Sequence, residues 1–166
     1  MLKKFSFVIF KVLNFFNLIF YFLTKRSFLG WLMFFLSNDC YTEKKIKDRK
    51  VKFYEPNNLI SWRVRTILDK EPDTIEWIDN FSIDNNDNFI FWDIGANIGL
   101  YSLYCASVHR NKSKIYAFEP STSNLRVLSR NISINNLNSK IIINQIPLSD
   151  KKNVHISMYE PEFTEG

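Results

Sequence analysis

The sequence is poor in the residues that build metal sites and disulfide frameworks, with two cysteines and two histidines among 166 residues. Cys40 and Cys105 lie far apart and lack the spacing of metal ligands, so we expect both to be reduced structural residues. His109 and His155 are isolated, which favours surface or packing roles. The sequence therefore predicts no metal site.

Glycine and proline are also scarce, at four and five residues, whereas phenylalanine is abundant at 16. Low glycine and proline content argues against long disordered segments, and no internal repeat is evident. The length gives room for one domain with a sizeable core.

Positive charge is distributed unevenly along the chain. Residues 1–70 contain 14 Lys and Arg against 5 Asp and Glu, a net charge of +9, whereas residues 71–166 contain 8 against 12, a net charge of −4. A basic half that is also apolar points to a membrane surface or another anionic partner. The arginine–aromatic interleaving typical of nucleic-acid binding does not occur, so we predict no nucleic-acid partner.

Residues 1–36 form the strongest hydrophobic segment, and Phe5–Leu23 is long enough to span a bilayer. Its polar residues follow one another at steps of three and four, which places them on one helical face: Lys11, Asn14, Asn17, Tyr21, Thr24 and Lys25. Three interpretations stay open, namely a helix in an anionic membrane interface, helices packed on the domain, and a true span. No small-x-small cleavage site follows, which argues against a signal peptide. Residues 41–58 are polar and basic, which predicts a linker or a solvated face.

The second half is centred on a strand, a glycine turn and a helix. Phe89–Trp92 is a short apolar run, Asp93 ends it, Gly95 and Gly99 follow, and an apolar helical pattern begins at Leu100. This arrangement is typical of the entry to a nucleotide-type ligand in an open α/β sheet, although an ordinary α/β core can also contain it.

The residues of this turn distinguish between ligands. A dinucleotide fingerprint has glycine at the position of Asn97, and its third glycine is missing here. An acid two residues before Gly95 suits a cationic ligand better than a diphosphate. S-adenosylmethionine carries an ammonium and a sulfonium group and no phosphate, so we predict it as the cofactor.

The following residues continue a βαβ pattern. Lys114–Phe118 is a second strand that ends at Glu119, 20 residues beyond Gly99, where such folds place the acid that binds ribose hydroxyls. Ser121 is positioned to cap the next helix. Residues 141–146 predict a third strand and residues 153–159 a fourth.

Three motifs together resemble the FkbM family of S-adenosylmethionine-dependent methyltransferases: Asp93–Ser102, Phe118-Glu119-Pro120 with Asn124, and Pro147–Asp150. The resemblance covers about residues 60–160 and implies a Rossmann-like class I methyltransferase fold that methylates oxygen on small molecules or sugars. It implies that Glu119 binds the ribose and Asp150 the adenine amino group. It also implies which loop residues surround the methionine part of the cofactor: Asp93, Gly95, Ala96, Asn97 and Gly99.

The chain departs from the family in one respect, because it supplies three or four of the family's seven strands. We therefore expect an incomplete α/β fold, with residues 59–166 as the first half of a methyltransferase domain, residues 41–58 as a basic linker and residues 1–40 as hydrophobic helices that could anchor to a membrane interface. An open half-sheet would expose a hydrophobic edge and face. The acceptor pocket and base would lie in the missing half, so no catalytic residue is assigned and activity would require that half.

Two alternatives from other classes remain, namely a dinucleotide-binding oxidoreductase half and a non-catalytic truncated remnant. The predicted partners are a small-molecule or carbohydrate acceptor and an anionic membrane surface. The predicted location is the cytoplasm, with peripheral attachment at the inner face of the membrane. The sequence does not determine the acceptor or the oligomeric state.

Overall fold

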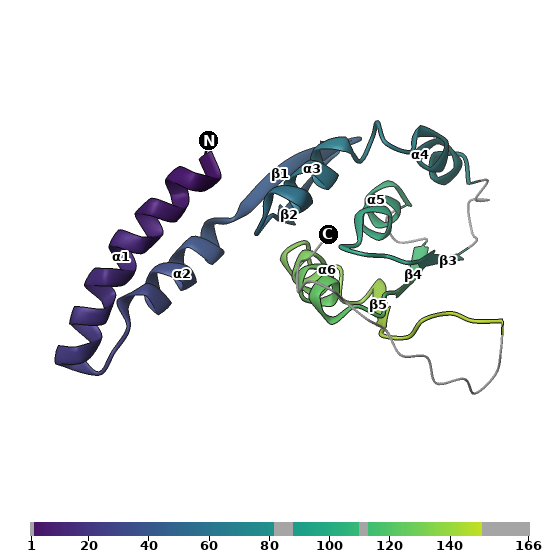
Figure 1. Ribbon diagram of the computed structural model, residues 1–166. Helices are drawn as coiled ribbons and strands as arrows, with labels where there is room; N and C mark the ends of the chain where they lie inside the picture. Colours follow the sequence, from purple (N-terminus) through teal and green to yellow (C-terminus); the bar gives the residue numbers. More distant parts are fainter. Residues whose placement is uncertain (1, 82–87, 110–112, 151–166) are drawn as a thin grey trace. The chain divides into compact units, whose positions relative to one another are not determined.

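The computed structural model describes residues 2–81, 88–109 and 113–150, and it divides the chain into two compact units, Met1–Cys40 and Tyr41–Gly166 (Figure 1). We call them unit 1 and unit 2. The strand predicted at residues 153–159 and His155 lie outside the described residues.

Unit 1 is a pair of apolar helices, α1 (Leu2–Thr24) and α2 (Phe28–Asp39), which lie side by side (Figure 1). α1 is long and apolar enough to cross a membrane, by length and composition alone. Ser27 caps α2, and its hydroxyl accepts a hydrogen bond from the Gly30 amide at 3.4 Å. The predicted helix and the apolar segment after it are thus both helical.

The polar stripe of α1 does not face solvent along its whole length. Asn17 is the one buried residue of the two helices, and its Oδ1 accepts hydrogen bonds from Ser27 Oγ at 2.9 Å and the Leu29 amide at 3.1 Å. Lys11 and Tyr21 are exposed. Asn17 is thus the member of the stripe that joins the two helices.

Residues 41–58, for which the sequence predicted a linker, contain an antiparallel hairpin of β1 (Tyr41–Ile46) and β2 (Arg49–Tyr54). In β2 the buried Val51 and Phe53 alternate with the exposed Lys50 and Lys52. The high charge of this segment lies on the outer face of a half-buried strand, which explains why its composition resembles that of a linker.

Side-chain amides of α6 (Thr122–Ile134) and its C-cap pair with the backbone of β2. The Tyr54 amide donates to Asn131 Oδ1 at 2.7 Å, and the Lys52 amide donates to Asn135 Oδ1 at 2.9 Å. Asn135 Nδ2 donates back to the Lys52 carbonyl at 2.7 Å. These bonds satisfy backbone groups of β2 that its hairpin partner does not reach.

The centre of unit 2 is a parallel sheet of β3 (Phe89–Ile94), β4 (Ser113–Phe118) and β5 (Ile141–Asn144), in that order. α5 (Leu100–His109) connects β3 to β4, and α6 connects β4 to β5. Unit 2 therefore has an α/β, partial Rossmann-like fold, as predicted. The cap on α6 is also confirmed, because Ser121 Oγ accepts a bond from the Asn124 amide at 3.3 Å.

The two faces of β3 differ in burial. Phe91 and Asp93 are buried on one face, whereas Ile90, Trp92 and Ile94 on the other are 63%, 59% and 63% exposed. Strands of parallel sheets are usually covered on both faces. The structure thus agrees with the expectation of an open apolar sheet face.

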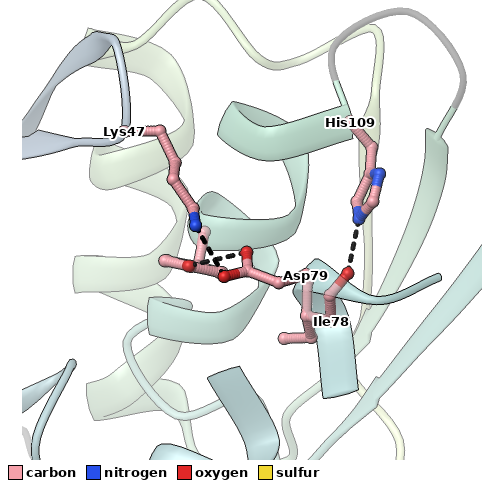
Figure 2. A network of polar contacts seen from close by, with 5 residues as sticks. Lys47, Ile78, Asp79 and His109 are labelled. Carbon is pink, nitrogen blue, oxygen red and sulfur yellow. Dashed lines mark hydrogen bonds and ion pairs between the residues drawn. The ribbon is translucent and has the colours of Figure 1, made fainter. Parts of the chain in front are cut away.

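Two helices precede the sheet, α3 (Asn58–Thr66) and α4 (Pro72–Asp79), and α4 begins at a proline, which suits the first position of a helix. Figure 2 shows how α4 is held. Asp79 pairs with Lys47 of the hairpin turn at 2.7 Å and accepts a bond from the Tyr104 hydroxyl of α5 at 2.9 Å. His109 Nε2 lies 2.6 Å from the Ile78 carbonyl, which confirms a packing role for this histidine.

Candidate functional site

The site lies at the carboxyl ends of β3 and β4, around the loop between β3 and α5. Gly95, Asn97 and Gly99 have positive φ angles of 73°, 52° and 85°. Glycine adopts this region without strain, and asparagine tolerates it better than most residues do. The Gly95 and Ala96 amides donate to the Phe118 carbonyl at 2.9 and 3.0 Å, which fixes the loop to the end of β4.

Glu119, which follows β4, is 5% exposed and forms bonds to both sides of the site. Its Oε2 accepts a hydrogen bond from the Asn97 amide at 2.7 Å. Its Oε1 accepts from the Ser121 amide at 2.9 Å and from Asn124 Nδ2 at 3.4 Å. The predicted ribose acid and the predicted glycine loop are therefore in direct contact.

Asp93 is 6% exposed and holds the start of α5, because its Oδ2 accepts bonds from the Ser102 amide at 3.0 Å and the Ser102 hydroxyl at 2.5 Å. Burial raises the pKa of this carboxyl, the bonds from Ser102 lower it, and the negative charge of Glu119 raises it further. Two buried carboxylates thus act on each other at the ends of adjacent strands.

Helix α6 supports the loop from behind. Asn131 is fully buried, and its Nδ2 donates to the Ile98 carbonyl at 2.9 Å. A side chain at Gly99 would overlap Leu128 of α6, so this glycine permits close packing of loop and helix. At Gly95 an added Cβ would meet nothing within 4 Å, and the requirement there is the φ angle alone.

A cavity of about 160 Å³ opens beside the loop. Gly95, Ala96 and Asn97 of the predicted set line it. The other lining residues come from α3, the turn before α4, the end of the loop and the start of α5: Arg63, Ile67, Lys70, Glu71, Ile98, Leu100 and Tyr101. Burial and the neighbouring Glu71 carboxylate raise the pKa of the Tyr101 hydroxyl, which therefore stays protonated at neutral pH.

The remaining predicted residues do not line this cavity. Asp93, Gly99 and Glu119 hold the loop through the contacts described above. Asp150 is exposed and accepts a hydrogen bond from Ser149 Oγ at 3.4 Å. Its proposed contact with adenine stays a prediction.

Sequence reasoning did not assign Arg63, Lys70, Glu71 and Tyr101 to the site. Arg63 lies as a charge within the largely apolar segment Leu59–Leu68, and Lys70 and Glu71 directly precede Pro72. A basic residue that interrupts the pattern of an amphipathic helix is the signal that could have identified Arg63. In the described part of the chain, no group of three acidic, cysteine or histidine side chains is placed to bind a metal.

No family model matches the sequence, and no curated protein matches it. Several solved structures are similar to the chain. One is a SAM-dependent methyltransferase from Agrobacterium tumefaciens, with TM-score 0.47, 11% identity, and coverage of 64% of this chain and 32% of that one. Another is TYW2 of M. jannaschii in complex with AdoMet, with TM-score 0.42, 23% identity, and coverage of 69% and 46%.

A third is a transferase from Pyrococcus horikoshii, PH0793, with TM-score 0.38, 22% identity, and coverage of 66% and 37%. The chain thus spans between a third and a half of the length of these proteins.

Proposed function

We propose that unit 2 binds S-adenosylmethionine and forms part of a methyltransferase of the FkbM type that methylates an oxygen atom of a small molecule or sugar. The observation that carries the proposal is the contact between Glu119 and the Asn97 amide, at the carboxyl ends of two adjacent parallel strands. Ligands of open α/β sheets bind at this edge, and an acid after the second strand accepts bonds from ribose hydroxyls.

The charges of the site favour this cofactor over a dinucleotide. Asp93 and Glu119 are both buried acids, and a diphosphate would add further negative charge beside them. A sulfonium or ammonium group would instead reduce their mutual repulsion. A carboxylate has about four acceptor positions. Three described donors use Glu119, which leaves room for a ribose hydroxyl.

In this proposal the loop of Asp93, Gly95, Ala96, Asn97 and Gly99 surrounds the methionine part of the cofactor, and Asp150 contacts the adenine. Methyl transfer requires mainly that acceptor oxygen, methyl carbon and sulfur be aligned. A hydroxyl acceptor also needs a base. We assign no catalytic base to this chain, and activity depends in this proposal on the remaining strands of the family's sheet.

Calorimetric titration of the full chain with S-adenosylhomocysteine, the product of methyl transfer, tests the cofactor. Glu119→Gln removes the charge from the ribose contact, so binding should weaken by about 1–3 kcal/mol. Glu76→Gln, at an exposed position of α4, is the matched control and should bind like the wild type. Equal affinities of the Glu119→Gln variant and the wild type would remove Glu119 from the site.

The same titration separates the alternatives. Binding of NAD without S-adenosylhomocysteine would favour an oxidoreductase half, and binding of neither would favour a non-catalytic remnant. The acceptor class is tested by transfer of a labelled methyl group to hydroxyl-bearing small molecules and sugars, with transfer RNA as the comparison. Labelling of RNA alone would overturn the predicted acceptor class.

We also propose that unit 1 attaches the protein to an anionic membrane surface at the cytoplasmic face. Large apolar side chains along α1 and α2 are exposed, among them Phe5, Phe15, Phe22, Trp31 and Phe35. Exposed patches of this extent are typical of membrane or protein contacts. Basic residues lie at both ends of α1, Lys3 and Lys4 in its first turn and Lys25 and Arg26 directly after it, and they suit an anionic headgroup layer.

The lengths of the two helices favour the interface over a transverse position. α1 has 23 residues, about 34 Å, but α2 has 12, about 18 Å. The hydrocarbon core is about 30 Å thick. If α1 crossed it with α2 still paired, the polar end of α2 at Ser37–Asp39 would stop within the hydrocarbon. A hairpin that lies in the interface avoids this cost.

A further inference from the structure

A second cavity lies in unit 2 beside the hairpin, and none of the described residues lines both this cavity and the one at the loop. Its volume is about 420 Å³, within the roughly 300–1,000 Å³ of pockets that enclose a small ligand. Its lining comes from both hairpin strands and from the last residue of α6: Tyr41, Thr42, Glu43, Lys52 and Ile134. An aromatic ring, a hydroxyl, a carboxylate and an ammonium group therefore surround one space.

Contacts between the hairpin and α6 fix the walls of this cavity. Asn135, the C-cap of α6, bonds to both backbone groups of Lys52. Arg130 of α6 donates from Nε to the Tyr41 hydroxyl, and its guanidinium lies 5.2 Å from the centre of the Tyr41 ring. The ring and the lysine backbone are thus held in place before a ligand binds, which lowers the entropic cost of binding.

The charge around the cavity is positive. Glu43 is engaged by Lys50, whose Nζ lies 2.8 Å from Glu43 Oε1. The Lys52 side chain, opposite Glu43 in the strand register, forms no ion pair with a described residue. Arg130 adds a further cation beside Tyr41. The cavity therefore suits a ligand that brings a negative group to Lys52.

The other polar groups of the cavity suit hydroxyls. Thr42 donates its own hydroxyl to the Glu55 carboxylate, so its oxygen is left to accept a bond from a ligand. The Glu43 carboxylate interacts with Lys50 and has about four acceptor positions in all. Two acceptors beside one cation thus favour a ligand that carries several hydroxyl donors as well as an acid group.

Apolar surface on the same cavity comes from Ile134 and from the half-buried Tyr41 ring. A sugar matches this combination, because its ring has C–H groups on its faces and hydroxyls around its rim. A nucleotide also offers an acid and an apolar face, but it has fewer hydroxyl donors for Glu43 and Thr42, and its phosphate would lie near the Glu43 carboxylate. The lining therefore favours an acidic sugar over a nucleotide.

We propose that this cavity binds one unit of an acidic sugar, a uronic acid. Its carboxylate pairs with Lys52, its hydroxyls donate to Glu43 and Thr42, and its ring packs on Tyr41. The site does not depend on the cofactor, since its described lining comes from the hairpin and α6 alone. An acidic sugar is one of the acceptors that the proposed function allows.

Calorimetric titrations of the full chain without cofactor test the site with three probes. Trigalacturonate carries hydroxyls and carboxylates, maltotriose carries hydroxyls alone, and hexauridylate carries phosphates and aromatic bases. Lys52→Gln removes the cation and keeps a similar side-chain length. Lys114→Gln, at an exposed position of β4 that does not line this cavity, is the matched control.

We expect the wild type to bind trigalacturonate at least about tenfold more tightly than either other probe. Lys52→Gln should weaken trigalacturonate binding about tenfold, to the level of maltotriose, because it removes a charge-assisted hydrogen bond. Tyr41→Phe keeps the ring and should bind like the wild type, whereas Tyr41→Leu should bind at least about threefold more weakly. Lys114→Gln should change none of these affinities.

A wild type that binds trigalacturonate no better than maltotriose would overturn the inference, as would equal losses in Lys52→Gln and Lys114→Gln. Tighter binding of hexauridylate than of trigalacturonate would assign the cavity to nucleic acid instead. Melting temperatures show whether the variants are folded, and if Tyr41→Leu is not, Lys52→Gln decides the inference. Titration with S-adenosylhomocysteine tests the proposed function separately, so a failure to bind cofactor leaves this inference standing.

Discussion

The two units of this chain place their large side chains in opposite ways. In unit 1 most phenylalanines and leucines of α1 and α2, and Trp31, are exposed, and the one buried residue of these helices is polar Asn17. In unit 2 the apolar side chains of α5, α6 and β4 are buried, for example Leu103, Leu128 and Ile115. Unit 2 thus buries apolar surface within itself, whereas unit 1 leaves much of its apolar surface exposed, which is the property on which the proposed membrane attachment depends.

Polar groups follow the same contrast. Asn17 joins the two helices of unit 1 through its bonds with Ser27 and Leu29, an arrangement that also occurs between helices in membranes. Asn131, Asp93 and Glu119 are buried in unit 2, where they connect loop, helix and strand ends. We therefore expect substitutions to have large effects on stability in unit 2 and effects on lipid binding in unit 1.

The largest expected effect is on the stability of unit 2. Asn131→Ala would leave the Tyr54 amide and the Ile98 carbonyl without their partners. Each buried unsatisfied group costs about 1–3 kcal/mol, so the free energy of unfolding should fall by about 3 kcal/mol. Urea unfolding, monitored by tryptophan fluorescence, measures this free energy. Asn138→Ala, at an exposed position, should change the free energy of unfolding by less than about 0.5 kcal/mol. Similar losses of stability in the two variants would contradict the role of Asn131.

The next effect is on lipid binding by unit 1. Lys25→Gln with Arg26→Gln should weaken binding to vesicles with anionic lipid by about 2 kcal/mol, because each basic residue near the surface contributes about 1 kcal/mol. Co-sedimentation at two salt concentrations measures it, and high salt should reduce wild-type binding. Lys45→Gln, exposed on β1 of unit 2, is the control. A protein that stays in solution with these vesicles at low salt would refute the anchor.

A smaller effect is expected at the contact between α1 and α2. Asn17→Leu removes the acceptor of the Ser27 hydroxyl and the Leu29 amide. Hydrogen bonds between helices in membranes contribute about 0.6 kcal/mol each on average, so the loss of two should raise amide exchange of residues 27–39 in vesicles about eightfold. Asn14→Leu, one turn earlier, is the control. Unchanged exchange in Asn17→Leu would show that the contact does not hold the pair.

The smallest expected effect is a pH dependence of unit 2. The pKa of Asp93 is raised by burial, so the folded state binds its proton more tightly than the unfolded state does. Stability should therefore fall as the pH rises from the ordinary aspartate pKa of 3.8 through the folded-state pKa. Asp93→Asn keeps an acceptor for Ser102 and removes this titration. As the pH rises, the free energy of unfolding of the variant should increase relative to that of the wild type. A difference that stays constant with pH would contradict the coupling between Asp93 protonation and folding.

The sequence by itself determined the local elements of unit 2. The apolar run at Phe89, the glycines at 95 and 99, and the acid at 119 predicted a strand, a loop and a second strand, and the structure has them within a few residues. These signals are short in range, because periodicity, backbone freedom and strand ends act over a few residues. The helices of unit 1 were predictable for the same reason.

Contacts between distant residues decided the rest. The hairpin of residues 41–54 is buried on one face because α6 packs on it, and Asn131 pairs with Tyr54 across 77 positions of sequence. Arg63 lines the cavity only because α3 lies beside the loop, and Asn17 is buried only because α2 covers it. Charge and polarity alone assign such residues to solvent, since the partner that removes them from water is specified by tertiary packing and not by their neighbours in sequence.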